Sequence, residues 1–214
     1  MNEKEKIEPQ NKPKKGDFYI LEPDMRGGRG PGVEFENEDA IPLPLYMCEP
    51  SEAGGLSQAK ETPRLRYDSR IGDMPNDLES GFKCYWLVSE PLKRVFELVD
   101  PHGFAFLRCS LLLEDGMEAP PHYLCEVVRI LDAIDESAST VNVFTGYPNG
   151  KYYSIAGGAI LAFNKEAIGS AHVFRTPYTA DAFCDRAMRD ALLEHGFGKS
   201  QRTLGVRLID AVGC

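Results

Sequence analysis

The sequence predicts an α+β fold, a mostly antiparallel sheet with two main helices packed on it. Many short stretches alternate or run apolar as strands do, and only two stretches have the apolar spacing of a helix. The two predicted helices do not alternate regularly with the predicted strands, which argues against a parallel α/β sheet. The chain has 214 residues, 43% of them hydrophobic, and this is enough to bury a core without a metal or disulfide.

The first helix is predicted to begin after Ser89, directly after an apolar strand. Serine can accept a hydrogen bond from a backbone N–H of the first turn, where Pro91 is tolerated. Asp100 and Pro101 end the helix, because proline disfavours helical backbone in the residue before it. The apolar stripe of this helix consists of Leu92, Val95, Phe96 and Val99.

The second helix is predicted to begin after Asp185, which can cap it, and to end before Gly196. One face of it carries Met188, Ala191, Leu192 and His195. The apolar segment 123–134 has an ambiguous period, and we expect a strand followed by a short helical turn near Asp132. Other strands are expected at 17–21, 33–37, 63–68, 84–88, 104–113, 140–145, 152–155, 160–163, 172–175 and 204–212, with an Asn-Gly turn at 147–150.

The domain organisation predicted from composition is simple. Residues 1–16 are polar, charged and interrupted by proline, which is typical of a flexible N-terminal tail. Residues 17–214 are expected to form a single α+β domain, and any junction between two subdomains falls near 114–122. No internal repeat is visible.

Charge and cysteine usage exclude several classes. The net charge of −9 repels phosphate backbones and the basic residues do not cluster, so we expect no direct nucleic-acid binding. No apolar stretch is long enough for a membrane span or follows the lysine-rich tail as in a signal peptide. The six cysteines lack metal-site spacing. Cys84, Cys109 and Cys125 lie in apolar runs, which predicts buried free thiols and a cytoplasmic protein.

The sequence contains no clear set of catalytic residues. Each of the four histidines has a structural explanation, and His122 with Glu126 is the best candidate pair, on one face of a strand. The glycine-rich segment 26–33 contains two arginines but lacks the Lys-Ser/Thr and the helix of a phosphate-binding loop. We therefore expect no enzyme activity, no metal and no cofactor. A small-ligand-binding protein or enzyme using His122 and Glu126, and a scaffold subunit, remain as alternatives.

Acidic residues on extended segments are the most distinctive feature. Between 34 and 52 there are six carboxylates and no Lys or Arg. Such segments, interleaved with aromatic residues, suit a protein-binding face that attracts a basic partner. The predicted partner-binding residues are Glu34, Glu36, Glu38, Asp39, Tyr46, Asp132, Asp135 and Glu136.

The order of several segments resembles a bacterial immunity protein family. The similar segments are Phe18–Leu21, Pro63–Asp68, Trp86–Ser89 with the following helix to Pro101, Tyr123–Asp135, Asn164–Gly169, His172–Arg175 and the helix after Asp185. The family is the one numbered forty-three among the immunity proteins of polymorphic-toxin systems, and the resemblance spans roughly 17–210. It rests on segment order rather than on a reactive motif, and the segment 26–60 is where the sequence departs from the family.

This resemblance implies a role rather than a reaction. Members of such families are implied to bind and block a cognate toxin in the producing bacterium. Their toxins are delivered by contact-dependent or type VI-like secretion and are often nucleases. The resemblance implies no catalytic residues. Together with the acidic charge, it leads us to expect a cytoplasmic inhibitor of a toxin domain with a basic surface.

Overall fold

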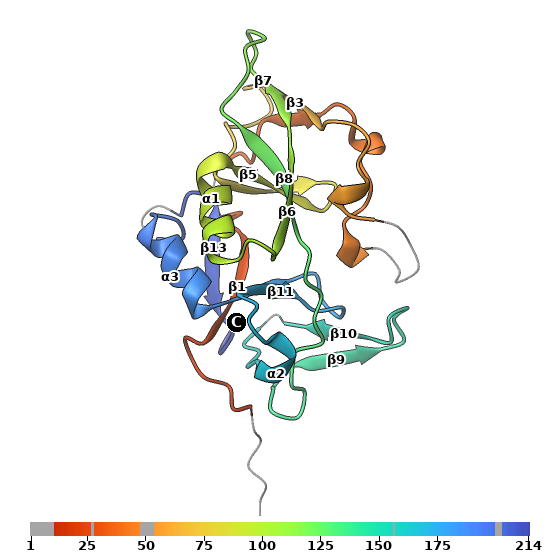
Figure 1. The fold of residues 1–214 in the computed structure, drawn as a ribbon, viewed down its shortest axis with the longest axis vertical. Coiled ribbons are helices and arrows are strands. Elements are labelled where there is room, and N and C mark those ends of the chain that lie inside the picture. Colours follow the sequence, from red (N-terminus) through yellow and green to blue (C-terminus); the bar gives the residue numbers. More distant parts are fainter. Residues whose placement is uncertain (1–10, 27, 48–53, 156, 200–202) are drawn as a thin grey trace, which may run out of the picture.

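The computed structural model describes residues 11–26, 28–47, 54–155, 157–199 and 203–214. It confirms the predicted α+β class: four β-sheets, antiparallel except for the pair β3–β7, and two main helices that lie side by side on one flank (Figure 1). Two four-stranded sheets form the centre, and a smaller sheet covers the outer side of each.

The first central sheet has the strand order β4-β5-β8-β6, and every neighbouring pair is antiparallel. Helix α1 connects β5 to β6, and β8 lies between these two strands. This arrangement is called module 1. It consists of β4 (Leu78–Phe82), β5 (Tyr85–Ser89), α1 (Glu90–Val99), β6 (Phe104–Arg108) and β8 (His122–Val127).

The second central sheet has the order β11-β12-β1-β13 and is also antiparallel throughout. Helix α3 connects β12 to β13, and the N-terminal strand β1 lies between these two. This arrangement is called module 2. It consists of β1 (Phe18–Pro23), β11 (Val173–Arg175), β12 (Ala182–Asp185), α3 (Arg186–Glu194) and β13 (Val206–Asp210).

The two modules share one topology, although no repeat is visible in the sequence. In each module, a β-hairpin is followed by a helix and then by a strand at the opposite edge of the sheet. A strand from a distant part of the sequence lies between the hairpin and this edge strand. Both helices also begin in the same way. The Ser89 hydroxyl accepts from the Leu92 N–H at 3.3 Å, and the Asp185 carboxylate accepts from the Met188 N–H at 3.0 Å.

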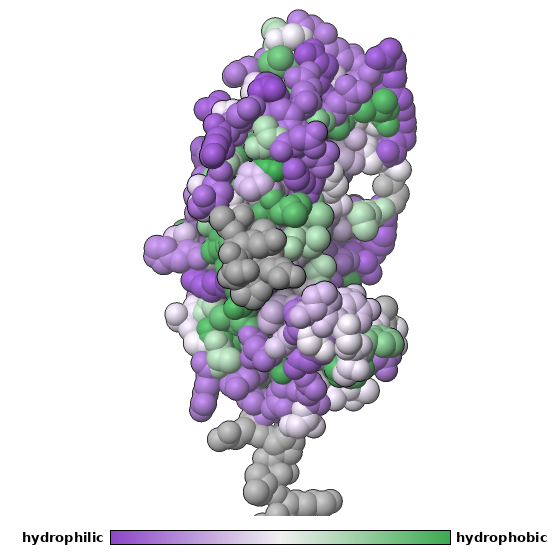
Figure 2. All heavy atoms as spheres, turned by 90° about the vertical axis from the view of Figure 1, so that its right-hand side faces the viewer, coloured by the Kyte–Doolittle hydropathy of each residue, from purple (hydrophilic) through white to green (hydrophobic). Residues whose placement is uncertain are grey.

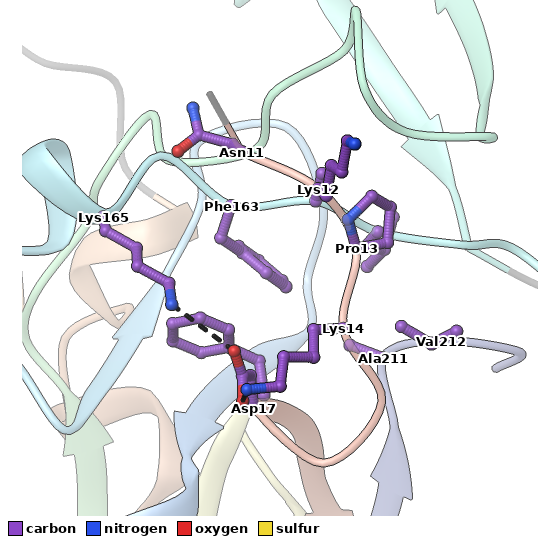
Figure 3. Close-up of a pocket in the computed structure, with 12 residues that line it drawn as sticks. Asn11, Lys12, Pro13, Lys14, Asp17, Phe163, Lys165, Ala211 and Val212 are labelled. Carbon is purple, nitrogen blue, oxygen red and sulfur yellow. Dashed lines mark hydrogen bonds and ion pairs between the residues drawn. The ribbon is translucent and has the colours of Figure 1, made fainter. Parts of the chain in front are cut away.

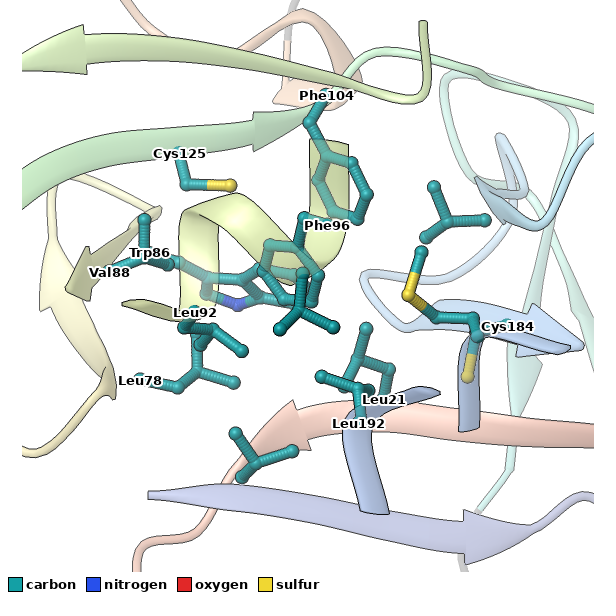
Figure 4. Packing of buried hydrophobic residues seen from close by; sticks show 14 of the residues in the cluster. Leu21, Leu78, Trp86, Val88, Leu92, Phe96, Phe104, Cys125, Cys184 and Leu192 are labelled. Carbon is teal, nitrogen blue, oxygen red and sulfur yellow. The ribbon is translucent and has the colours of Figure 1, made fainter. Parts of the chain in front are cut away.

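The largest hydrophobic core lies where the two modules face each other. Apolar side chains of α1 and α3 meet those of both central sheets there, around Trp86 and Phe96 (Figure 4). The rings of Phe96 and Phe104 stack with centroids 4.3 Å apart. The predicted stripe of α1 is confirmed, because Leu92, Val95 and Phe96 are buried. Both caps and both helices were predicted from the sequence.

Each module has its own outer layer. β2 (Val33–Phe35), β3 (Arg64–Tyr67) and β7 (Ser110–Leu112) pack over module 1, with three 3-10 turns, η1 (Glu38–Ala40), η2 (Leu45–Met47) and η3 (Leu56–Gln58). The hairpin of β9 (Asn142–Thr145) and β10 (Lys151–Ser154), together with α2 (Lys165–Ile168), packs over module 2. The segment between β8 and β9 also belongs to the outer layer of module 2. With it, the two outer layers carry all of the predicted partner-binding residues.

Several local predictions are corrected. Segment 160–163 is not a strand; its ends, Ile160 and Phe163, make only isolated bridges. No helical turn forms near Asp132, because Ile130 and Ile134 bridge to other segments. The run 104–113 is two strands that separate at Cys109, whose N–H donates to the His122 carbonyl at 2.9 Å. Strands β4 and β12 and helix α2 were not predicted.

Cys84 is exposed, contrary to the prediction of a buried thiol. It lies in the two-residue turn between β4 and β5, where Lys83 and Cys84 have φ values of 52° and 66°. Both central residues of such a turn need a positive φ, so the chain reverses here and the apolar strand begins one residue later. Cys109 and Cys125 are buried, as predicted.

Candidate functional site

The first acidic segment is balanced by arginine from a neighbouring strand. Glu34 lies exposed on β2, and Glu36, which is also exposed, follows directly after this strand. The antiparallel partner strand β3 places Arg66 opposite Glu34. The Arg66 Nε is 2.7 Å from the Glu36 Oε1. The sequence between 34 and 52 contains no basic residue, but strand pairing brings one in from outside that range. This face therefore carries both signs of charge.

Glu38 and Asp39 extend this surface. Both are exposed in η1, and neither carboxylate forms an ion pair with another described residue. Lys83 approaches from the β4–β5 turn, and its Nζ donates to the Glu38 carbonyl at 2.9 Å. Within the described part of the first acidic segment, Glu36 is thus ion-paired, and Glu34 and the two carboxylates at η1 are not.

Tyr46 is fixed by the fold. Its hydroxyl donates to the Cys84 carbonyl at 2.9 Å, and the Arg175 guanidinium lies 4.1 Å from its ring centroid. Burial raises the pKa of Tyr46. Arg175, which is 4% exposed, also lies 5.3 Å from the Trp86 ring. The Tyr46 ring therefore covers the buried Arg175 guanidinium, and only part of the Tyr46 side chain is exposed to solvent.

The second acidic segment consists of Asp132, Asp135 and Glu136. These residues line an open groove of about 430 Å³ on the outer layer of module 2. Glu136 accepts hydrogen bonds from the Lys151 Nζ and, at 2.7 Å, from the Tyr153 hydroxyl, which lower its pKa. Asp135 accepts from the Ser137 hydroxyl at 2.6 Å and from the Asn11 amide at 3.0 Å, and its pKa is also lowered. Asp132 is exposed and lies 3.5 Å from the Tyr178 hydroxyl.

The eight predicted partner-binding residues do not form one site. β2 and β3 lie near one end of the long axis of the molecule, and the hairpin beside Glu136 lies near the other (Figure 1). Tyr46 lies on neither acidic surface. The structure thus offers two separate acidic surfaces, one on each outer layer.

The family model of the immunity protein family Imm11 matches residues 17–212. The chain belongs to the Imm11 family. The match covers both modules and both outer layers, so it includes every predicted partner-binding residue. The prediction of an immunity protein family is confirmed, and the matching family carries the number eleven where the sequence resemblance pointed to forty-three. No curated protein matches the chain.

In this Imm11 protein, His122 and Glu126 share a face of β8, as predicted, but they are separately engaged. The His122 Nδ1 lies 2.8 Å from the Pro120 carbonyl. Glu126 accepts hydrogen bonds from the Leu45 N–H and, at 3.1 Å, from the Leu56 N–H. Four residues of strand separate the two by about 13 Å, which is too far for direct proton transfer. The pair forms no catalytic unit, and its hydrogen bonds account for both groups structurally.

The glycine-rich loop has a structural role. Gly32 and Gly72 approach so closely that a Cβ on Gly32 would lie 2.6 Å from the Gly72 carbonyl oxygen. The Gly32 N–H donates to the Asp73 carbonyl at 2.7 Å, and the Arg29 guanidinium donates to the Arg70 carbonyl at 2.6 Å. The loop amides and Arg29 thus hold a neighbouring turn.

A pocket of about 250 Å³ lies beside the N-terminal segment and is lined by Phe18 and Phe163 among others (Figure 3). Lys12, Lys14 and Lys165 line it, and the Asp17 carboxylate lies 3.4 Å from the Lys165 Nζ. None of its lining residues is a histidine, cysteine or serine.

Within the described residues, no three His, Cys, Asp or Glu side chains are grouped closely enough to hold a metal ion. In the same ranges, no helix has the length and apolar character needed to cross a membrane.

Proposed function

We propose that this Imm11 protein binds a cognate toxin domain in the cytoplasm of the producing bacterium and neutralises it. The match to the family over 17–212 is the observation that carries the proposal. The net charge of −9 supports a toxin with a basic surface, because opposite charges accelerate encounter and favour the correct partner. A nuclease toxin would have such a surface, since it must bind a polyanion.

The two acidic surfaces are the proposed contacts. Glu34, Glu36, Glu38 and Asp39 form the first, and Asp132, Asp135 and Glu136 the second. Because Arg66 neutralises Glu36 and Lys151 neutralises Glu136, we expect the unpaired carboxylates at η1 and Asp132 to contribute most to long-range attraction. Removing a rim charge is expected to slow association more than it speeds dissociation.

The test is protection of bacteria from the toxin encoded by the neighbouring gene, together with binding kinetics of the purified proteins. Co-expression is expected to restore growth and the two proteins to bind directly. Glu38→Gln with Asp39→Asn is expected to slow association and flatten its salt dependence, whereas Glu36→Gln, the matched control, has a smaller effect. Absence of both protection and binding for the wild type would refute the proposal.

The proposal also states that protection needs no catalysis by this chain. His122→Asn is expected to protect cells as well as the wild type, because the one hydrogen bond of the His122 ring to a described residue is with the Pro120 carbonyl. Loss of protection by a folded, toxin-binding His122→Asn variant would favour the enzyme alternative instead.

A further inference from the structure

The hairpin β9–β10 presents three exposed aromatic side chains on its outward face. Phe144 on β9 lies directly opposite Tyr152 on β10, and the Tyr147 ring stacks on Tyr152 with centroids 5.3 Å apart. Phe144 is 52% exposed, Tyr147 47% and Tyr152 37%. The hairpin projects on the side of the molecule that Figure 2 shows, where pale and green residues of intermediate and hydrophobic character gather in the lower part.

The inward face fixes this hairpin to module 2. Tyr153 is fully buried, and its hydroxyl donates to Glu136. The Lys151 Nζ lies 4.2 Å from the Tyr178 ring centroid, and the Asn149 side-chain amide donates to the Pro177 carbonyl near the hairpin tip. The exposed aromatic residues are therefore held on an anchored hairpin, which lowers the entropy cost of binding.

One edge of the hairpin has open backbone groups. The Tyr153 N–H donates to the Tyr178 carbonyl at 2.8 Å, so the peptide groups of Tyr153 point away from β9. In an antiparallel pair the opposite residue then also points away, and this residue is Val143. By the same alternation, the N–H and C=O of Thr145 point outward. Neither residue makes a backbone hydrogen bond on that side with any described residue.

This edge lacks the protection that edge strands usually have. β9 reads Asn-Val-Phe-Thr, without lysine or proline, and all four residues are exposed. Soluble proteins usually protect such an edge with charge, proline or a covering segment, because open N–H and C=O groups pair with another strand. Here, open groups and exposed aromatic residues lie on the same strand.

We propose that the outer edge of β9 is the toxin-docking site and that an extended segment of the toxin pairs with it as an added strand. The inference rests on the proposed function. Phe144, Tyr147 and Tyr152 would contact apolar side chains of that segment, while Asp132 and the acidic groove behind the hairpin attract its basic residues. Charge argues against a second copy of this chain, because two copies of net charge −9 repel each other.

Amide hydrogen exchange of the full chain, with and without the toxin domain encoded by the neighbouring gene, tests the edge directly. The Val143 and Thr145 amides are expected to exchange at least tenfold more slowly in the complex. The Phe144 amide points toward β10 and serves as an internal control, with a much smaller change. Unchanged exchange at Val143 and Thr145 in a formed complex would overturn the proposal and leave the proposed function intact.

A substitution pair separates backbone pairing from side-chain contact. Thr145→Pro removes the outward N–H without disturbing the β9–β10 hydrogen bonds, and the matched variant Thr145→Val keeps that N–H. Thr145→Pro is expected to weaken toxin binding at least tenfold, and Thr145→Val less than twofold. Circular dichroism and urea unfolding establish whether both variants fold; if Thr145→Pro does not, Tyr152→Ser, expected to weaken binding severalfold, replaces it.

The remaining outcomes are also decisive. Equal affinity of folded Thr145→Pro and wild type would overturn strand addition at β9. A wild type that does not bind the toxin refutes the proposed function and this inference with it. Sedimentation of the chain alone is expected to show a monomer. A dimer that Thr145→Pro abolishes would show that a second copy, not the toxin, occupies this edge.

Discussion

The carboxylate of Asp100, just past the end of α1, accepts a hydrogen bond from the backbone N–H of His172 at 2.9 Å. It also accepts from the Val173 N–H at 3.2 Å and from the Arg129 guanidinium. The side chain of Asp100 is 4% exposed. One buried carboxylate of module 1 therefore holds the beginning of β11 in module 2.

Asp100→Asn is expected to lower the free energy of unfolding by about 3 kcal/mol, because it leaves the Arg129 cation without its buried partner. Urea unfolding measures the change. Asp115→Asn is the control, since the exposed Asp115 carboxylate accepts, among the described residues, only from the nearby Met117 N–H, and we expect a change within about 0.5 kcal/mol. Equal stability of Asp100→Asn and wild type would contradict the role of Asp100 as a link between modules.

The same carboxylate predicts a pH dependence. Burial raises the pKa of Asp100, but the Arg129 guanidinium and the His172 and Val173 amides outweigh burial and lower it overall. A lowered pKa means that the stabilisation is present above the unfolded value of about 3.9 and is lost as the pH falls through the folded value. The difference in stability between wild type and Asp100→Asn should therefore shrink below about pH 4. A difference that stays constant to pH 2 would contradict this.

Glu126 is predicted to hold the segment that contains η2 and η3 on the sheet of module 1. Its two carboxylate oxygens accept from the Leu45 and Leu56 N–H groups. Glu126→Ala removes both acceptors, and the two amides are expected to exchange about ten- to a hundredfold faster, since such a bond contributes about 1.5–3 kcal/mol. Glu126→Gln keeps one oxygen and should release one amide more than the other. The Leu87 amide in β5 is the control and should not change.

Cys84→Gly is expected to stabilise the protein. Cys84 has a φ of 66°, and a residue with a Cβ is about 1–2 kcal/mol less stable in this region than glycine. The backbone carbonyl that accepts from Tyr46 is unchanged by the substitution. The free energy of unfolding should rise by about 1 kcal/mol, whereas Cys84→Ser, which keeps a Cβ, should resemble wild type. A loss of stability in Cys84→Gly would mean that the side chain makes a contribution its exposure does not suggest.

Thiol labelling of the native protein should distinguish Cys84 from the buried cysteines. Cys109, Cys125 and Cys184 are buried, and burial raises the pKa of each thiol, that of Cys109 to about 12. Rapid labelling should fall by one thiol in Cys84→Ser relative to wild type. After denaturation without reductant, all six cysteines should be free. Cys48 contributes to that count but lies outside the described residues.

The sequence by itself determined the elements whose signals are local. Helix α1 was predicted with its cap and its end, because its signals lie within the helix or next to it. These signals are a capping side chain, an apolar stripe and a terminating proline. The same holds for α3, which begins after Asp185. Strands with clear alternation, such as β2 and β3, were also found, because alternation depends only on neighbouring residues. The immunity class followed from segment order and was confirmed.

Only the tertiary structure decided which distant segments meet. Strand pairing brought Arg66 to Glu36, so an acidic run became a surface of mixed charge. It also showed that two sequences without visible similarity form one repeated topology, since different apolar residues can fill equivalent positions in a core. The open edge of β9 was invisible in the sequence for the same reason. Whether a strand's N–H groups are paired depends on its neighbours across the sheet, not on its own residues.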